Sequence, residues 1–290
     1  MMEITRFIKG LFGHKYKKVA LVLSGGGARG YAHIGAIEEL LAQGYEITSV
    51  AGSSMGAFIG AMYASGHLED IKKWFTDLDN QKIRSLVDIS LGLNHVVKGD
   101  KLMNDLEKFI PDMDIEEMKI PFMAVSTNLT TGEEEILDHG SMWQAVRASI
   151  SIPGFFKPVK EDGDIFVDGC VLNPLPLNLV KREKGDLLAC VNVIAGHDSA
   201  GTCRLEDEVA DIIMSPSDAQ QSKWGIMSFL RSKFPRPDLS DNAFNMSLRM
   251  SRLMVQRNAM LMEALYHPDI CVNIPMEKFG LFDFTKAAVI

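Results

Sequence analysis

The sequence is poor in cysteine, and its cysteines follow no pairing pattern. Cys170, Cys190, Cys203 and Cys271 are widely spaced, and none belongs to a C-x-x-C pair. This density is far below that of a small disulfide-stabilised domain, so the sequence predicts free thiols in a reducing compartment. We expect most of them to fill space as small buried side chains.

Long apolar runs are also missing from the chain. The longest, at residues 19–23 and 187–195, are too short to cross a bilayer. The first eighteen residues lack the continuous apolar stretch of a secretory signal. We therefore expect a cytoplasmic protein that at most contacts the inner face of the membrane.

An excess of positive charge is absent as well. The formal net charge is -8 and the sequence pI is near 5.4, which argues against non-specific binding to nucleic acid. No H-x-E or H-E-x-x-H cluster indicates a metal site, and we expect no cofactor. The chain has 290 residues, 47% of them hydrophobic, which is enough for one domain with a sizeable core.

Residues 1–17 form a basic segment that differs from the rest of the chain. Up to residue 18 the sequence holds five basic residues and one acid. Apolar side chains recur at helical spacing within residues 4–12, which predicts a short amphipathic helix. Such a helix could contact a membrane surface or dock on the protein body. We expect residues 18–290 to form a single domain.

The chain begins with alternating strands and helices. Residues 18–24 and 49–54 are typical of buried strands, and helices are predicted at 28–42 and from Met55 onward. This order favours an α/β fold with a parallel sheet and helices on both faces. Further helices are predicted within 67–110, at 141–149 and within 204–264, and further strands at 119–129, 133–139, 164–167, 187–194 and 269–275.

A glycine-rich turn, Gly25 to Gly30, separates the first strand from the first helix. Its backbone N–H groups and the following helix N-terminus suit an anion. The turn fits the G-x-G-x-x-G dinucleotide fingerprint, but the second strand ends in Gly52-Ser53-Ser54 rather than in the acid that would hold a ribose. A purely structural turn is another interpretation. An oxyanion hole is the use that fits best beside a nucleophile.

The second strand leads into a match to G-x-S-x-G, formed by residues 52–56. A strand before it and a helix after it are the context that a nucleophile elbow requires. Gly52 and Gly56 would relieve crowding around Ser54, and the pattern favours Ser54 over Ser53 as the nucleophile. Both this turn and the glycine-rich turn are expected at the carboxyl edge of the sheet, where α/β proteins bind ligands.

A serine hydroxyl needs a base to accept its proton. His197 and His267 come late enough in the chain for the order serine, acid, histidine of the α/β-hydrolases, but no motif surrounds either. The alternative base is Asp168, which a short strand delivers and Gly169 follows. An aspartate before glycine is also common in ordinary turns.

Taken together, GGGARG, GSSMG and DGC in this order resemble the patatin-like phospholipases. The block RASISIPGFFKP at residues 147–158 also resembles the segment that precedes the catalytic aspartate in that family. The likeness extends from about Lys18 to Pro176, with a weaker match in NIPMEKFGLFDF. Compact bacterial members are the most similar.

The resemblance implies a patatin-like three-layer α/β/α sandwich around a mainly parallel sheet, with 18–290 as the catalytic domain. It implies a Ser54–Asp168 dyad without histidine, forming an acyl-enzyme on a lipid ester. The implied oxyanion hole consists of Gly26, Gly27, Ala28 and Arg29, supported by the motif glycines Gly25, Gly30, Gly52, Gly56 and Gly169. Two departures are Cys170, where the family usually has glycine or alanine, and Ser24, where it often has aspartate.

The substrate is less well specified than the chemistry. The resemblance favours a phospholipid or a lysophospholipid, and a broad carboxylesterase, an acyltransferase or a lipid-binding regulator with latent activity are alternatives. Residues 223–234 place aromatic and apolar side chains among cations, which suits a membrane contact or lid, or a helix packed on the core. The methionines of residues 246–262 could line an acyl pocket or fill the core.

Overall fold

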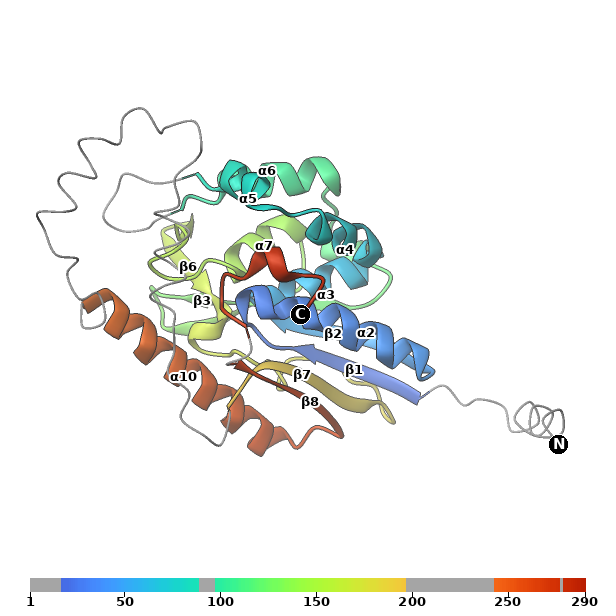
Figure 1. The fold of residues 1–290 in the computed structure, drawn as a ribbon. Coiled ribbons are helices and arrows are strands. Elements are labelled where there is room, and N and C mark those ends of the chain that lie inside the picture. The colour runs from blue at the N-terminus through green and yellow to red at the C-terminus, as the bar shows by residue number, and fades with distance from the viewer. Residues whose placement is uncertain (1–16, 89–96, 197–242, 277–278) are drawn as a thin grey trace, which may run out of the picture.

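The structure, a computed structural model, describes residues 17–88, 97–196, 243–276 and 279–290 (Figure 1). The expected N-terminal amphipathic helix, the segment 223–234, His197 and Cys203 lie outside these ranges. The separation of residues 1–17 from one domain at 18–290 therefore stays a prediction. No helix within the described ranges combines the length and the apolar character needed to span a membrane.

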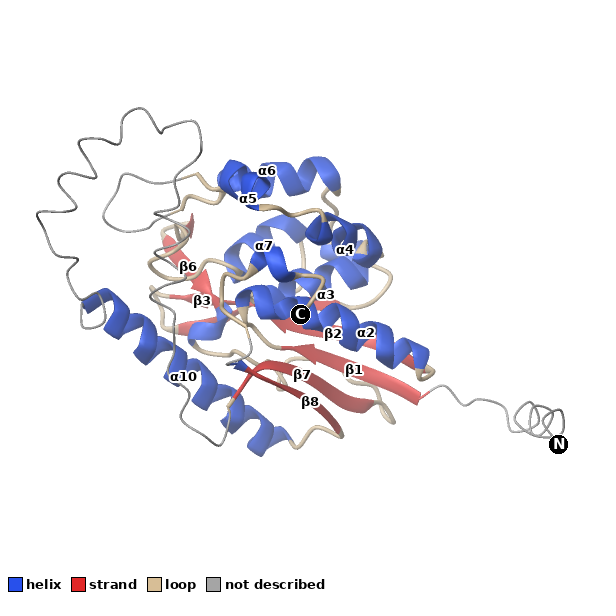
Figure 2. Ribbon diagram, viewed as in Figure 1, coloured by secondary structure: helices blue, strands red, loops and turns tan. Residues whose placement is uncertain are grey.

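Figure 2 shows the helices and strands of the described residues. The strands are β1 (Lys17–Leu23), β2 (Tyr45–Ser53), β3 (Phe122–Asn128), β4 (Glu133–Leu137), β5 (Val159–Glu161), β6 (Asp164–Asp168), β7 (Leu187–Ala195) and β8 (Ile270–Pro275). The α-helices are α2 (Ala32–Ala42), α3 (Met55–Ser65), α4 (Leu68–Thr76), α5 (Asn80–Leu86), α6 (Asp100–Phe109), α7 (Met142–Ser149) and α10 (Ala243–Tyr266). The 3₁₀ turns are η1 (Gly27–Tyr31), η2 (Ile115–Glu117), η3 (Gly169–Val171) and η7 (Phe284–Lys286).

The described strands form one mixed sheet in the order β5-β6-β3-β2-β1-β7-β8, with β4 also paired to β3. The central strands β3, β2, β1, β7 and β8 are parallel to their neighbours in this order, whereas β4, β5 and β6 pair antiparallel. Strand β1 is buried from Val19 to Leu23, as expected for a strand covered on both faces.

Crossover handedness explains why helices cover both faces. The chain moves from β1 through β2 to β3 in one direction along the sheet, so right-handed crossovers place α2 and α3 on the same face. It moves from β7 to β8 in the opposite direction, so α10 lies on the other face, where Figure 1 shows it. The predicted three-layer α/β/α sandwich around a mainly parallel sheet is confirmed.

Several element boundaries differ from those predicted. The glycine turn continues into the 3₁₀ turn η1, so α2 begins at Ala32 rather than at residue 28. The short strand β5 was not predicted, because its three residues give no periodic signal. Helix α7 does have the expected cap: the Ser141 side chain accepts a hydrogen bond from the Gln144 N–H.

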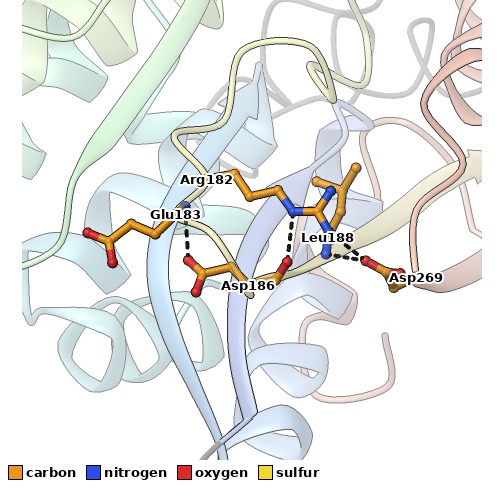
Figure 3. A network of polar contacts seen from close by, with 5 residues as sticks. All are labelled: Arg182, Glu183, Asp186, Leu188 and Asp269. Carbon is orange, nitrogen blue, oxygen red and sulfur yellow. Dashed lines mark hydrogen bonds and ion pairs between the residues drawn. The ribbon is translucent and has the colours of Figure 1, made fainter.

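The start of β7 is tied to the start of β8 by polar contacts that Figure 3 draws. The Asp269 carboxylate accepts hydrogen bonds from the Leu188 N–H at 2.8 Å and from Arg182 at 3.0 Å. Arg182 also donates to the Asp186 carbonyl at 2.7 Å. These contacts fix the register in which β8 lies against β7.

Candidate active site

Two strands meet end to end against β3, and this meeting creates the site. Val125 pairs with both Ser53 of β2 and Ile136 of β4. The next residue, Ser126, pairs with both Asp168 of β6 and Glu135 of β4. A strand has only two edges, so β2 and β6 share the edge of β3 opposite β4. The ends of β2 and β6 therefore come together, although they are far apart in the sequence.

The side chains at this junction form a direct hydrogen bond. The Ser54 Oγ donates to Asp168 Oδ2 at 2.5 Å, and the exposed fractions of the two residues are only 4% and 3%. Burial raises the pKa of the Asp168 carboxyl from 3.8 to about 6, while hydrogen bonds from Ser54 and Cys170 partly oppose this rise. The carboxylate is thereby a stronger base than an exposed aspartate.

The serine elbow is strained and sterically restricted. Ser54 has φ 53° and ψ -123°, a backbone conformation that non-glycine residues rarely adopt. A Cβ on Gly52 would lie 2.4 Å from the backbone of Gly56, and a Cβ on Gly56 would lie 2.2 Å from the Leu23 carbonyl oxygen. Both positions therefore require glycine for the close approach that presents Ser54.

Ser149 supports the elbow from the end of α7. Its hydroxyl accepts a hydrogen bond from the Ser54 N–H at 2.9 Å and donates to the Val125 carbonyl at 2.6 Å. It is fully buried, so this single hydroxyl links the nucleophile to the strand on which β2 and β6 meet. Ser149 belongs to the RASISIPGFFKP block, but no role was predicted for it.

The glycine turn lies next to the nucleophile. A Cβ on Gly25 would lie 3.2 Å from the Ser54 Cβ, and Gly27 lines the same cavity as Ser54. The Ala28 N–H donates to the Leu281 carbonyl at 2.8 Å, so it already has an acceptor. The N–H groups of Gly26 and Gly27 have no acceptor among the hydrogen bonds of the described residues.

Two buried side chains brace this turn. Arg29, 3% exposed, donates from Nε to the Gly26 carbonyl at 3.0 Å and from Nη1 to the Met276 carbonyl at 3.3 Å. His33 Nε2 lies 2.8 Å from the Ser24 carbonyl, and burial lowers the pKa of His33 to about 4, which keeps the ring neutral. His33 was not predicted as a site residue, although a histidine on the apolar face of a predicted helix is a usable signal.

Cys170 lies beside the dyad, but its thiol is not suited to act as the nucleophile. Its N–H donates to Asp168 Oδ1 at 2.8 Å, and its Sγ lies 3.5 Å from the Ser53 Oγ. A Cβ on Gly25 would lie 2.0 Å from this sulfur, so the first turn requires glycine there. Burial, with the Asp168 charge, raises the pKa of the thiol well above its ordinary value, and such a thiol is a poor nucleophile.

The histidine alternatives receive no support from the described residues. His267 is exposed and precedes β8, so it lies at the amino edge of the parallel strands, whereas Ser54 lies at the carboxyl edge. His67 and His139 form exposed pairs with Asp70 and Asp138. His197, the other candidate, is outside the described ranges.

An apolar cavity of about 130 Å³ adjoins the nucleophile. Apart from Ser54 and Gly27, its lining is almost entirely apolar and aromatic. The residues come from η1, from α3 to α6, from the loop after α7 and from η7, and they include Tyr31, Met55, Phe58, Trp74, Phe75, Leu102, Leu106, Ile150, Phe155 and Phe284. For comparison, a dry apolar cavity of about 150 Å³ holds a benzene molecule. The open depression of about 460 Å³ at Asp70, Lys73 and Lys82 is charged and contains neither dyad residue.

Residues 246–262, the methionine-rich stretch, do not line this cavity, so the cavity gives no support to the acyl-pocket alternative. The alternative interpretation, that these residues fill the core, applies only in part, since Ala259 is buried and Met262 is half-buried. Met246, Met250, Met254 and Met260 are instead 46–61% exposed.

Comparisons with known proteins show what the chain is similar to. The chain is 38% identical over 181 residues to an NTE family protein of Mycobacterium tuberculosis, an overlap that covers 62% of this chain and 50% of the relative. It is 27% identical over 280 residues, 92% of this chain, to a patatin-like phospholipase domain-containing protein of Caenorhabditis elegans, 24% of which is covered. The crystal structure of VipD from Legionella pneumophila aligns at 21% identity with a TM-score of 0.43, covering 67% of this chain and 52% of VipD.

The chain spans about half the length of the mycobacterial relatives that it matches. The model of the patatin-like phospholipase family matches residues 21–181, a range that contains the glycine turn, the serine elbow and Asp168. That range is more than half of the sequence. The chain therefore belongs to the patatin-like phospholipase family, whose members are generally lipid acyl hydrolases.

Proposed function

We propose that this chain hydrolyses acyl esters of lipids, phospholipids or lysophospholipids, with Ser54 as nucleophile and Asp168 as general base. The observation that carries the proposal is the 2.5 Å hydrogen bond between Ser54 Oγ and Asp168 Oδ2 at the end of an apolar cavity. The hydrogen bond activates the hydroxyl, and the cavity offers an apolar environment to an acyl chain.

The reaction would proceed in two steps. Asp168 takes the hydroxyl proton as Ser54 attacks the ester carbonyl, and the N–H groups of Gly26 and Gly27 stabilise the oxyanion. The alcohol leaves with the proton from Asp168, and the acyl group stays on Ser54. Water then attacks the acyl-enzyme and gives a proton to Asp168. As the bond between the acyl group and Ser54 Oγ breaks, Asp168 passes this proton to Ser54 Oγ and the fatty acid is released. One oxyanion donor typically contributes about 3–4 kcal/mol to transition-state stabilisation.

The small volume of the cavity supports a second candidate substrate, an ester with a short acyl chain. About 130 Å³ is below the usual size of a pocket for a drug-sized ligand, about 300 Å³ or more. A short acyl chain fits this volume directly, whereas a long chain requires movement of lining side chains such as Phe284 or Phe155. A short-chain carboxylesterase is therefore the alternative to a phospholipase.

The test compares wild type with Ser54→Ala and Asp168→Asn on p-nitrophenyl esters of graded chain length. Vesicles of phosphatidylcholine and micelles of lysophosphatidylcholine follow, with release of free fatty acid as the readout. We expect both variants to lose hydrolysis by at least a thousandfold. Because Asp168 must be ionised, wild-type kcat/KM should fall as pH decreases through about 6.

Ser53→Ala is the matched control, because this neighbouring hydroxyl does not bond to Asp168. It should keep both hydrolysis and labelling by a fluorophosphonate, whereas Ser54→Ala should lose both. Hydrolysis that survives in Ser54→Ala would disprove the assignment. Wild type that neither hydrolyses these substrates nor reacts with the fluorophosphonate would favour a lipid-binding regulator. Activity confined to short esters would favour the carboxylesterase.

A further inference from the structure

Two cysteines that are distant in the sequence lie side by side at the edge of the sheet. Cys190 of β7 and Cys271 of β8 are direct partners in the parallel register, and their sulfur atoms are 3.2 Å apart. The contacts of Asp269 at the start of β8 (Figure 3) fix this register. The proximity therefore follows from strand pairing and not from spacing along the chain, which explains why no C-x-x-C pattern predicted it.

Helix α10 adds a carboxylate to the two thiols. Glu263 Oε1 lies 3.4 Å from the Cys271 Sγ, and the ligand atoms of Cys190, Cys271 and Glu263 all lie within 4.8 Å of one another. The same Glu263 oxygen accepts a hydrogen bond from Asn192 Nδ2 at 2.7 Å. Asn192 is buried, so it holds the carboxylate in place as outer partners of metal ligands do.

The donor atoms decide which cation would fit. Two sulfur ligands favour zinc over the hard ions calcium and magnesium, which prefer oxygen. Two thiolates on one tetrahedral zinc ion stand about 3.8 Å apart, from zinc–sulfur bonds of about 2.3 Å. The thiols would need to separate by only about 0.6 Å from their present distance. Cys190 is buried and Cys271 is exposed, so one side of the cluster is open to water.

We propose that Cys190, Cys271 and Glu263 bind one zinc ion, with water as the fourth ligand. Binding replaces the two thiol protons, which pass to solvent, and the ion joins β7, β8 and α10 at one point. The cluster shares no residue with the dyad, and a zinc ion here would link α10 to the two outer strands.

The test is a titration of the full chain, kept reduced by a phosphine, with zinc against a chromophoric chelator. We expect one bound equivalent in wild type. Cys190→Ser, Cys271→Ser and Glu263→Gln should each weaken binding by at least tenfold, and Asn192→Ala should weaken it by about 10- to 100-fold. Cobalt should give a thiolate charge-transfer band in wild type that Cys271→Ser lacks.

Cys170→Ala is the matched control, since it removes a thiol outside the cluster and should still bind one equivalent. Saturating zinc should raise the Tm of wild type but not that of Cys271→Ser. Because Cys271 is exposed, its serine variant should fold, and circular dichroism without zinc checks this. Zinc binding equal in wild type and Cys271→Ser would overturn the proposal. A reduced protein that takes up no zinc, but forms a Cys190–Cys271 disulfide in air, would overturn it as well.

Discussion

The two residues of the dyad are held in place in different ways. Ser54 is presented mainly by the tight turn that Gly52 and Gly56 allow, and the Ser149 hydroxyl adds one contact from a distant segment. Asp168 is held by distant partners: its N–H donates to the Ser151 carbonyl at 3.0 Å, and its carbonyl accepts from Thr127 at 3.2 Å. The nucleophile is thus a product of local sequence, and the base is a product of tertiary structure.

The largest effect is expected where the local restriction is broken. Gly52→Ala or Gly56→Ala places a methyl group 2.2–2.4 Å from backbone atoms that cannot move independently. We expect the free energy of unfolding to fall by about 4 kcal/mol or more, with complete loss of ester hydrolysis. Chemical denaturation and the p-nitrophenyl assay measure both.

Gly35→Ala in α2 is the control for these variants. An added Cβ at Gly35 meets no atom within 4 Å, so alanine should stabilise the helix by about 0.5–1 kcal/mol. Full activity in Gly52→Ala would show that the elbow does not depend on its glycines.

The next effect concerns the charge of the base. The carboxyl of Asp168 has a pKa of about 6 in the folded chain and an ordinary value of 3.8, so the folded state binds its proton more tightly. Stability is therefore lost as pH rises from about 4 to about 6, by at most about 3 kcal/mol. Asp168→Asn removes this cost while it abolishes catalysis.

We expect Asp168→Asn to have a higher Tm than wild type at pH 8, by a few degrees, and the same Tm near pH 4. Thermal melts across this range measure the difference. A variant less stable than wild type at pH 8 would show that the ionised carboxylate contributes more through its hydrogen bonds than it costs through burial.

A smaller effect is expected from Ser149→Ala, which removes the hydroxyl that links the serine elbow to β3. It leaves the buried Ser54 N–H and Val125 carbonyl without their partner, at a cost of about 1–3 kcal/mol. We expect kcat to fall more than KM rises, because the nucleophile loses its orientation. Ser65→Ala, which removes only a bond to the Met62 carbonyl, is the control. An unchanged kcat in Ser149→Ala would show that the orientation of Ser54 does not depend on its link to β3.

The smallest effect is expected from Cys170→Ala. The thiol makes only a minor contribution that lowers the pKa of Asp168, after burial and the bonds from Ser54 and the Cys170 N–H. We expect stability to change by less than about 1 kcal/mol and the pH profile of kcat/KM to shift slightly upward. A shift downward would contradict the hydrogen bond from the thiol to the carboxylate.

The same contrast explains what the sequence could predict. The glycine turn, the elbow and the strands β1 and β2 were predicted because each depends on residues that are adjacent in the chain. The role of Ser149, the meeting of β2 and β6 at Val125 and Ser126, and the Cys190–Cys271 pair were not, because strand register is a property of the whole sheet. The residues alone left Asp168, His197 and His267 as candidate bases, since an Asp-Gly pair is also typical of turns, and the family resemblance favoured Asp168.

The end-to-end meeting of β2 and β6 has a consequence for how the protein folds. Ser54 and Asp168 are separated by 114 positions, so the dyad forms only after a large loop of chain has closed. The elbow, by contrast, can form as soon as β1, β2 and α3 associate. In a refolding experiment, recovery of esterase activity should therefore lag behind the recovery of helical signal, and catalysis would report the completion of the sheet.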